Sequence, residues 1–207
     1  MSSPAPAPTP SPSLSVELNG SVALKLTTFA EESYPNIETG PILGFDKKDT
    51  DANSISINIT KIFQFPVNNN DEIFTLRGYN GKYQNDVLAK LKDTKTGVKL
   101  LGWFISTTNG KFISQTIVDS MVHLQEYNKR ENKDETPILY LVYDPSKALD
   151  GVLSLKVFKL SEQFIKTYYS EDRFIPKNLI ENKLSYKNIF EEVPTTLKNT
   201  FLTNLKT

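Results

Sequence analysis

The chain has 207 residues, and its 24 basic and 24 acidic side chains leave it with no net charge at pH 7. It therefore lacks the global positive charge that draws a protein to nucleic acid or to an anionic membrane. It has no cysteine and one histidine, which excludes disulfides and thiolate zinc sites and is too few for a histidine-based zinc site. No apolar run approaches the ~20 residues that span a bilayer, and the first residues lack the pattern of a signal peptide. A cytosolic or nuclear protein is the simplest interpretation, and we expect the cytoplasm.

Residues 1–14 are rich in proline, serine and alanine, a composition that cannot build a core and predicts a disordered tail. A short strand over Ser15–Leu18 and a helix are expected to follow. We expect Ser21 to cap this helix and Tyr34-Pro35 to end it, because proline cannot continue a helix. The helical spacing of its apolar residues indicates one apolar face, made of Val22, Leu26, Phe29 and Ala30.

Two strands joined as a hairpin are expected next. Gly40–Phe45 is a short apolar run, and Ser54–Phe65 begins with isoleucines at alternate positions, which is typical of a half-buried strand. A helical stripe follows, formed by Tyr83, Val87, Leu88 and Leu91. Lysines cluster nearby, and we interpret them as a solvated surface rather than as contacts to RNA phosphates; they are Lys90, Lys92, Lys95 and Lys99.

The middle of the chain alternates strands and helices. Val98–Ser106 is expected to be the central strand of the sheet, and Ile113–Tyr127 a helix with an apolar face. The continuous apolar run Pro137–Tyr143 is typical of a strand that is covered on both faces. A further strand is expected over Gly151–Leu160.

The C-terminal part begins with a short helix from its cap at Ser161 through Tyr168. Leu184–Val193 is weakly strand-like, and the apolar spacing of Thr195–Leu205 predicts a last helix. This mixed order of elements predicts an α/β (mixed α+β) fold, with a central mixed β-sheet flanked by helices. We expect one main domain over residues 15–168, followed by an extension over 169–207 that holds a short strand and the start of a helix.

Hydroxyl side chains gather where the central strand ends, which is where an α/β-type enzyme holds its chemistry. Ser106, Thr107 and Thr108 lie there, but a nucleophile needs an adjacent base, and His123 is the single imidazole that could serve. We interpret His123 as a surface or interface residue. Trp103 and Phe104 on the same strand are interpreted as core residues rather than as a stacking platform for bases.

The segment Leu100–Asp119 resembles the zinc-binding motif of the MPN (JAMM) metalloprotease family. In active members, a Gly-Trp-Tyr strand end runs into His-Ser/Thr-His, a Ser-x-x-Asp pair follows on the next helix, and two histidines and the aspartate bind zinc. This chain keeps the strand end as Gly102-Trp103-Phe104. Thr116 and Asp119 keep the Ser-x-x-Asp spacing, whereas Ile105 and Thr107 stand at the two histidine positions.

The resemblance implies the MPN fold with a pocket that lacks its metal ligands. We expect Asp119 to have a structural role, with Thr107, Thr116 or a backbone N–H as its hydrogen-bond partner. Glu38 is the nearest counterpart of the general-base glutamate that active members place shortly before a Gly-x-x-Leu-Gly strand. Without a bound zinc ion, no water is acidified for this base to deprotonate. The implied protein has neither a metal cofactor nor catalytic activity.

Within this family the chain is similar to the h subunits of eukaryotic translation initiation factor three. The segments that carry this similarity are Tyr143–Lys147, Leu153–Lys156 and Phe190–Pro194. It implies a non-catalytic scaffold subunit that pairs with an f-type MPN subunit, joins other subunits through a helical bundle, and acts indirectly on the small ribosomal subunit and mRNA. The h subunits continue with long helices beyond this point, so a chain that ends at Thr207 is expected to be a fragment or a shortened form.

Partner contacts are expected on the first helix, the helix over Ile113–Asn128 and the last helix. The candidate interface residues are Phe29, Met121, Leu124, Tyr127, Leu197 and Phe201. Two alternatives stay open. One is a metal-dependent isopeptidase-like hydrolase with altered ligands, in which Glu38, Asp119 and Asp144 would have to converge. The other is an inactive MPN subunit of the proteasome lid or the COP9 signalosome.

Overall fold

The computed structural model describes residues 13–49, 53–66, 78–94, 97–107, 112–131, 134–168 and 188–198. The strands in these ranges are β1 (Ser13–Asn19), β2 (Glu38–Asp49), β3 (Ser54–Ile62), β4 (Lys99–Ser106), β5 (Leu139–Tyr143), β6 (Leu155–Leu160), β7 (Phe190–Val193) and β8 (Thr195–Lys198). The α-helices are α1 (Gly20–Ser33), α2 (Gly78–Asp93), α3 (Gln115–Glu131) and α4 (Glu162–Tyr168), and η1 (Pro145–Asp150) is a 3-10 helix.

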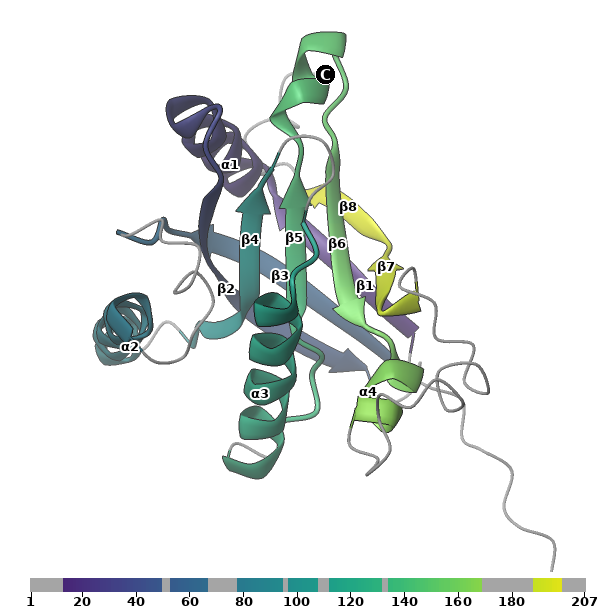
Figure 1. Ribbon diagram of the computed structural model, residues 1–207. Coiled ribbons are helices and arrows are strands. Elements are labelled where there is room, and N and C mark those ends of the chain that lie inside the picture. The colour runs from purple at the N-terminus through teal and green to yellow at the C-terminus, as the bar shows by residue number, and fades with distance from the viewer. Residues whose placement is uncertain are drawn as a thin grey trace, which may run out of the picture.

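All eight strands belong to one mixed sheet with the order β7-β6-β5-β4-β2-β3-β1-β8 (Figure 1). The neighbours β2 and β3 form the expected antiparallel hairpin, while β4 and β5 run parallel and are connected through α3. The expected α/β fold with a central mixed sheet and flanking helices is therefore confirmed. Both β4 and β5 have sheet neighbours on either side, and every residue of β5 is buried, as the continuous apolar run indicated.

The segment β7–β8 joins the two ends of this strand order. β7 pairs antiparallel with β6, and β8 pairs parallel with β1 on the opposite end of the sheet. Pro194 alone separates the two strands, and its carbonyl accepts a hydrogen bond from the backbone N–H of Val16 at 2.9 Å. In Figure 1 the yellow ribbon of this segment crosses from β6 to β1.

The prediction of a helix over Thr195–Leu205 is therefore wrong for its first four residues, because they form β8. Hydrogen bonding to the open edge of β1 outweighs the weak helical pattern, and the two β-branched threonines fit a strand. The remainder of that expected helix, including Phe201, lies outside the described residues. So do residues 1–12 of the expected tail, whereas Ser13 and Leu14 already belong to β1.

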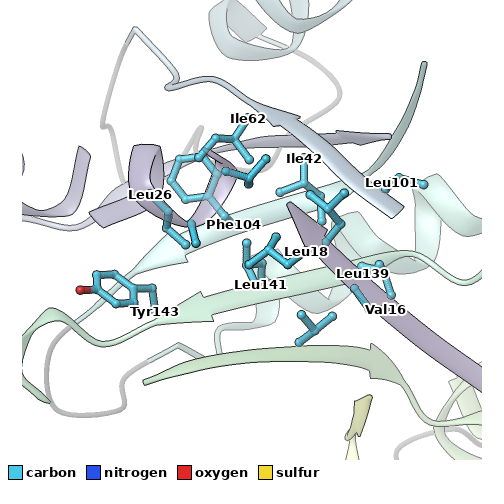
Figure 2. Packing of buried hydrophobic residues seen from close by; sticks show 14 of the residues in the cluster. Val16, Leu18, Leu26, Ile42, Ile62, Leu101, Phe104, Leu139, Leu141 and Tyr143 are labelled. Atoms are coloured by element: carbon cyan, nitrogen blue, oxygen red, sulfur yellow. The ribbon is translucent and has the colours of Figure 1, made fainter. Parts of the chain in front are cut away.

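Two apolar clusters lie on opposite faces of β4 and β5. The α1-side core contains Phe104, Leu141 and residues of β1 and β3 beneath α1 (Figure 2). The α3-side core contains Trp103, Ile105 and the buried face of α3. Successive residues of β5 alternate between these clusters, as do Trp103, Phe104 and Ile105 of β4, which is the period of two expected for a strand covered on both sides.

Helix α1 ends at Ser33, before Pro35, as expected, but Asn19 rather than Ser21 is its N-cap. The Asn19 side-chain oxygen accepts a hydrogen bond from the Ser21 backbone N–H at 3.3 Å. For α4 the expected cap is confirmed, since the Ser161 hydroxyl accepts from the Phe164 backbone N–H at 3.1 Å. The strand expected from Gly151 begins only at Leu155, because Gly151 ends η1 in the left-handed conformation with φ 74°.

Helix α2 buries polar residues instead of the expected apolar stripe. Asn80 and Gln84 are buried, whereas Tyr83 is exposed and Leu88 is half-exposed. The indole N–H of Trp103 donates a 3.0 Å hydrogen bond to Gln84 Oε1. A buried indole donor requires an acceptor, so this bond decides which face of the helix meets the sheet.

Across the described ranges, the longest apolar stretch of any helix falls short of what is needed to cross a bilayer.

Candidate functional site

The two residues that the sequence motif places at the histidine positions lie at the end of β4. Ile105 is buried in the α3-side core and has no lone pair to offer a metal ion. Thr107 is also buried, and its backbone N–H donates to the Tyr143 carbonyl at 3.0 Å, which ties the end of β4 to β5. The neighbouring Thr108 lies outside the described residues. These side chains fill space at the strand end and provide no imidazole or thiolate donor.

The third ligand position, Asp119, lies on α3 and is bound to other side chains. Its Oδ1 accepts hydrogen bonds from Gln115 Nε2 at 2.9 Å and from the Tyr168 hydroxyl at 2.8 Å. These partners differ from the Thr107 or Thr116 that we expected. Thr116 is exposed on α3, and the observed partner Tyr168 comes from α4, 49 positions away along the chain.

Glu38 lies on the other face of the sheet. It pairs directly with Ser106 in the β2–β4 register, and Thr39 pairs with Ile105. Directly paired residues share a face and neighbours alternate, so Glu38 faces α1 while Ile105 faces α3. The Ser33 hydroxyl at the end of α1 donates to Glu38 Oε2 at 2.6 Å, in agreement with this placement.

The carboxylates of the hydrolase alternative therefore do not converge. Glu38 is bound at the end of α1, Asp119 is bound between α3 and α4, and Asp144 caps η1 by accepting from the backbone N–H of Ser146 at 3.0 Å. Among the described residues no three His, Cys, Asp or Glu side chains are grouped as metal ligands would be. The residues present do not fit the zinc ion that the MPN motif would hold.

The hydroxyl nucleophile alternative also lacks its geometry. Ser106 is buried on the α1 face, next to Glu38 in the register. His123 is exposed on α3, which covers the opposite face of the sheet. Trp103 and Phe104 are fully buried in the two cores, so they cannot stack on bases, as we expected.

The structure changes the set of candidate interface residues. Met121 and Leu124 are 0% and 4% exposed in the α3-side core, so their apolar surface is used within the chain and we withdraw them as interface residues. Phe29 is partly buried and stacks on Phe104, with ring centroids 6.4 Å apart. Tyr127 and Leu197 remain, with 56% and 53% of their surface exposed.

Sequence reasoning missed the most exposed large apolar side chain on α1. Leu24 is 71% exposed, because it lies two positions from both Val22 and Leu26, about 200° around the helix from the buried stripe. A helical projection of residues 20–33 could have shown this single leucine on the polar side. The exposed side chains of Val152 and Leu153 follow η1, which contacts α1.

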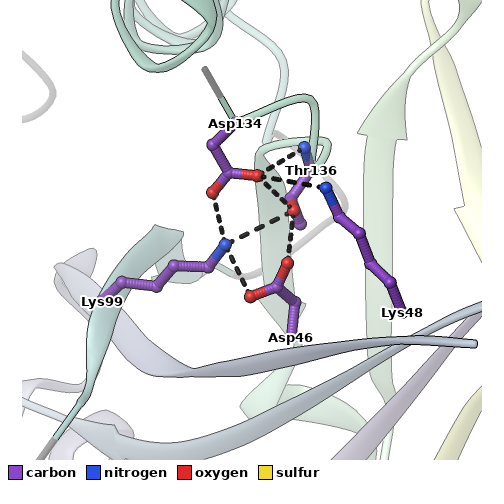
Figure 3. Close-up of polar contacts among 5 residues, drawn as sticks. All are labelled: Asp46, Lys48, Lys99, Asp134 and Thr136. Atoms are coloured by element: carbon purple, nitrogen blue, oxygen red, sulfur yellow. Dashed lines mark hydrogen bonds and ion pairs between the residues drawn. The ribbon is translucent and has the colours of Figure 1, made fainter. Parts of the chain in front are cut away.

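A polar network at the opposite end of β4 was also missed (Figure 3). Lys99 forms ion pairs with Asp46, at 2.7 Å, and with Asp134, while Lys48 lies 3.8 Å from Asp134. The Thr136 hydroxyl lies 2.7 Å from Asp46 and 2.6 Å from Asp134. The network joins β2, β4 and the segment before β5, so Lys99 is a structural residue and not part of a free lysine patch.

These contacts change the titration of both carboxyl groups. Burial opposes ionisation of Asp134, but hydrogen bonds from Lys99 and Thr136 outweigh burial and lower its pKa from 3.8 to about 2. The same balance lowers the pKa of Asp46. Lys90 and Lys92 are exposed on α2 as expected, and Lys95 lies outside the described residues.

Comparison with known families agrees with this geometry. Residues 11–130, more than half of the chain, match the sequence profile described as JAB1/Mov34/MPN/PAD-1 ubiquitin protease. The chain belongs to the JAB1/Mov34/MPN/PAD-1 family. Residues 148–206 of this MPN protein match a second profile, the C-terminal region of eIF3h. The resemblance inferred from the sequence motifs is thereby confirmed.

Curated relatives of this MPN protein are H subunits of eukaryotic translation initiation factor 3. The protein from Neurospora crassa is 32% identical over 200 residues, which cover 91% of this chain and 52% of the relative. The protein from Arabidopsis thaliana is 32% identical over 197 residues, which cover 93% of this chain and 54% of the relative. The chain thus spans about half the length of the curated relatives it matches.

A solved structure of similar fold is that of protein DSY2949 from Desulfitobacterium hafniense. It superposes with a TM-score of 0.50 over 89% of this chain and 94% of that protein. The sequence identity is 16%, so this likeness concerns the fold alone.

Proposed function

We propose that this chain is a non-catalytic MPN subunit of eukaryotic translation initiation factor 3, equivalent to about half the length of an eIF3h subunit. The observation that carries the proposal is the match to two profiles, an MPN profile over residues 11–130 and the eIF3h C-terminal profile over 148–206. The second profile separates this assembly from the proteasome lid and the COP9 signalosome, which are the assemblies of our second alternative.

The donor set of the pocket supports a non-catalytic role. Ile105 and Thr107 stand at the positions where active MPN enzymes have zinc-binding histidines. Asp119 Oδ1 accepts hydrogen bonds from two side chains. Glu38 faces α1 on the other side of the sheet. A hydrolase needs a metal-bound water within hydrogen-bond reach of its base, and these residues provide neither.

The chain is proposed to act as a scaffold in the cytoplasm through protein–protein contacts. Its partners would be an f-type MPN subunit, bound by MPN–MPN heterodimerisation, and other subunits that share a helical bundle with it. It would act on the small ribosomal subunit and mRNA indirectly through the complex. The exposed apolar residues Leu24, Tyr127 and Leu197 are the contacts we propose for these partners, together with Phe29, which is partly buried against the α1-side core.

The division into domains follows the same proposal. Residues 15–168 would form the MPN domain, and 169–207 a C-terminal extension. The extension contributes β7 and β8 to the sheet, so it is an integral part of the folded unit up to Lys198.

The test is capture of partners from cell extract with the tagged full chain, combined with a measurement of zinc per chain. We expect initiation factor 3 subunits, an f-type MPN subunit among them, and no stoichiometric zinc. A Leu24→Lys, Tyr127→Lys variant should lose these partners, whereas an Asp86→Lys, Asp93→Lys control on exposed α2 should keep them. Capture of proteasome-lid or signalosome subunits instead would refute the assignment. Stoichiometric zinc with cleavage of ubiquitin chains would restore the hydrolase alternative.

A further inference from the structure

Two adjoining cavities open at the end of the sheet where β1 begins. Their volumes are about 580 and 390 Å³, and both are lined by Leu14, Lys159 and Glu162. In Figure 1 this region lies at the lower right, where the start of β1, the yellow β7 and α4 come close together. The two cavities adjoin at these shared residues, and we call them together the β1–α4 groove.

The floor of the β1–α4 groove is apolar in the smaller cavity. Leu14 on β1 and Ile55 on β3 are partly buried residues that pack against the α1-side core. Leu160 and Ile165 come from the opposite wall, at the end of β6 and on α4. Contact with another apolar side chain would bury the apolar surface that these residues still expose to water, which is favourable in free energy.

The rim of the groove is acidic. Five carboxylates line it, against two lysines, Lys48 and Lys159; the carboxylates are Asp49, Glu135, Glu162, Glu191 and Glu192. Both lysines are already engaged, Lys159 with Glu191 at 3.2 Å and Lys48 with Asp134 at 3.8 Å. Of the carboxylates, Glu192 is also paired, with Lys156 at 2.9 Å. Within the described ranges Glu135 and Glu162 are exposed and have no ion-pair partner, so the rim presents net negative charge around an apolar floor.

We propose that the β1–α4 groove binds a short basic amphipathic segment of another protein. Aliphatic side chains of the segment would enter the floor, and its lysines or arginines would lie against Glu135 and Glu162. Complementary charge gives such a site its selectivity, and the apolar floor gives it affinity. The acidic rim repels phosphates, which makes nucleic acid an unsuitable ligand. The inference rests on the groove alone and holds whether or not the chain acts in translation initiation.

The test uses fluorescence anisotropy with the full chain and three labelled ten-residue peptides. The first alternates leucine and lysine, the second has glutamate in place of lysine, and the third has serine in place of leucine. We expect the first peptide to bind, with an affinity that falls as salt is added. The other two peptides should bind at least about tenfold more weakly. Absence of binding by the first peptide, or equal binding of all three, would overturn the proposal.

Charge reversal locates the binding site. The Glu135→Lys, Glu162→Lys variant should bind the first peptide with at least about tenfold lower affinity, because the acidic rim becomes basic there. Both side chains are exposed, so the substitutions leave the core intact. The matched Asp86→Lys, Asp93→Lys variant places the same charge change on exposed α2 and should change binding by less than about twofold. Equal loss in both variants would mean that the peptide responds to net charge only, and the groove would not be its site.

Discussion

Replacing Asp134 by asparagine removes one carboxylate from the network around Lys99 and keeps the shape of the side chain. The carboxyl pKa falls from 3.8 to about 2 in the folded chain. At 1.36 kcal/mol per pKa unit this shift corresponds to about 2.5 kcal/mol. The Asp134 side chain is 18% exposed, so solvent screens its ion pair and the full value overestimates its effect. We therefore expect Asp134→Asn to lower the free energy of unfolding at pH 7 by about 1–2 kcal/mol.

The pH dependence distinguishes this mechanism from a loss of packing. A carboxyl group whose folded pKa is depressed stabilises the folded chain above its unfolded pKa, and this contribution is lost as pH falls through the folded pKa. About half of it should be lost by pH 3 and most of it by pH 2. The stability gap between the parent chain and Asp134→Asn should therefore narrow between pH 7 and pH 3.

Urea unfolding followed by circular dichroism at pH 7, 4 and 3 measures this gap. The matched control is Asp86→Asn, which removes a carboxylate from the exposed side of α2 and should change stability by less than about 0.5 kcal/mol at every pH. A gap of the same size at pH 7 and pH 3 would show that the network acts through shape rather than charge. Absence of any gap at pH 7 would show that it contributes nothing.

Three further substitutions test other contacts. Trp103→Phe removes the indole donor to buried Gln84 and leaves a small cavity. Urea unfolding should therefore show a free energy of unfolding lower by about 2–3 kcal/mol. An unchanged midpoint would mean that the hydrogen bond is not formed. Gly102→Ala places a Cβ 1.8 Å from the Leu139 carbonyl oxygen on β5, so the variant should not fold to a soluble protein. Its control is Gly97→Ala, where the added Cβ meets open space and the free energy of unfolding should fall by only about 1 kcal/mol. In the same urea assay Tyr168→Phe should cost about 1 kcal/mol through loss of its hydrogen bond to Asp119 on α3, and an unchanged midpoint would show that this bond contributes nothing.

Local patterns were sufficient to predict most strands and helices. The isoleucine alternation of β3, the continuous apolar run of β5 and the helical spacing of α1 each depend on neighbouring residues, and each element was found where expected. The proposal of a non-catalytic site likewise needed the sequence alone, because Ile105 and Thr107 are residue types that cannot bind a metal ion as histidines do. These predictions needed no knowledge of which distant segments pair.

Four of the failures share one cause, which is dependence on distant partners. Thr195–Lys198 became a strand because β1 offers it an edge, and Asp119 found its partner on α4. The sequence alone did not show whether the apolar face of α3 contacts a partner or the core of this chain. In the structure this face, with Met121, packs on the sheet in the α3-side core. The polar buried face of α2 followed from a single indole donor on β4.

The closure of the sheet by β7–β8 has a consequence for how the chain folds during its synthesis. The ion pair between Glu17 on β1 and Lys198 on β8 joins residues 181 positions apart. At 5–20 residues per second, the ribosome takes roughly 10 to 35 s to make the chain between them. Throughout that interval the first strand has an unpaired edge, and pairings of such long sequence separation form slowly. Nascent chains shorter than about 198 residues should therefore be the species that chaperones hold and that aggregate most readily.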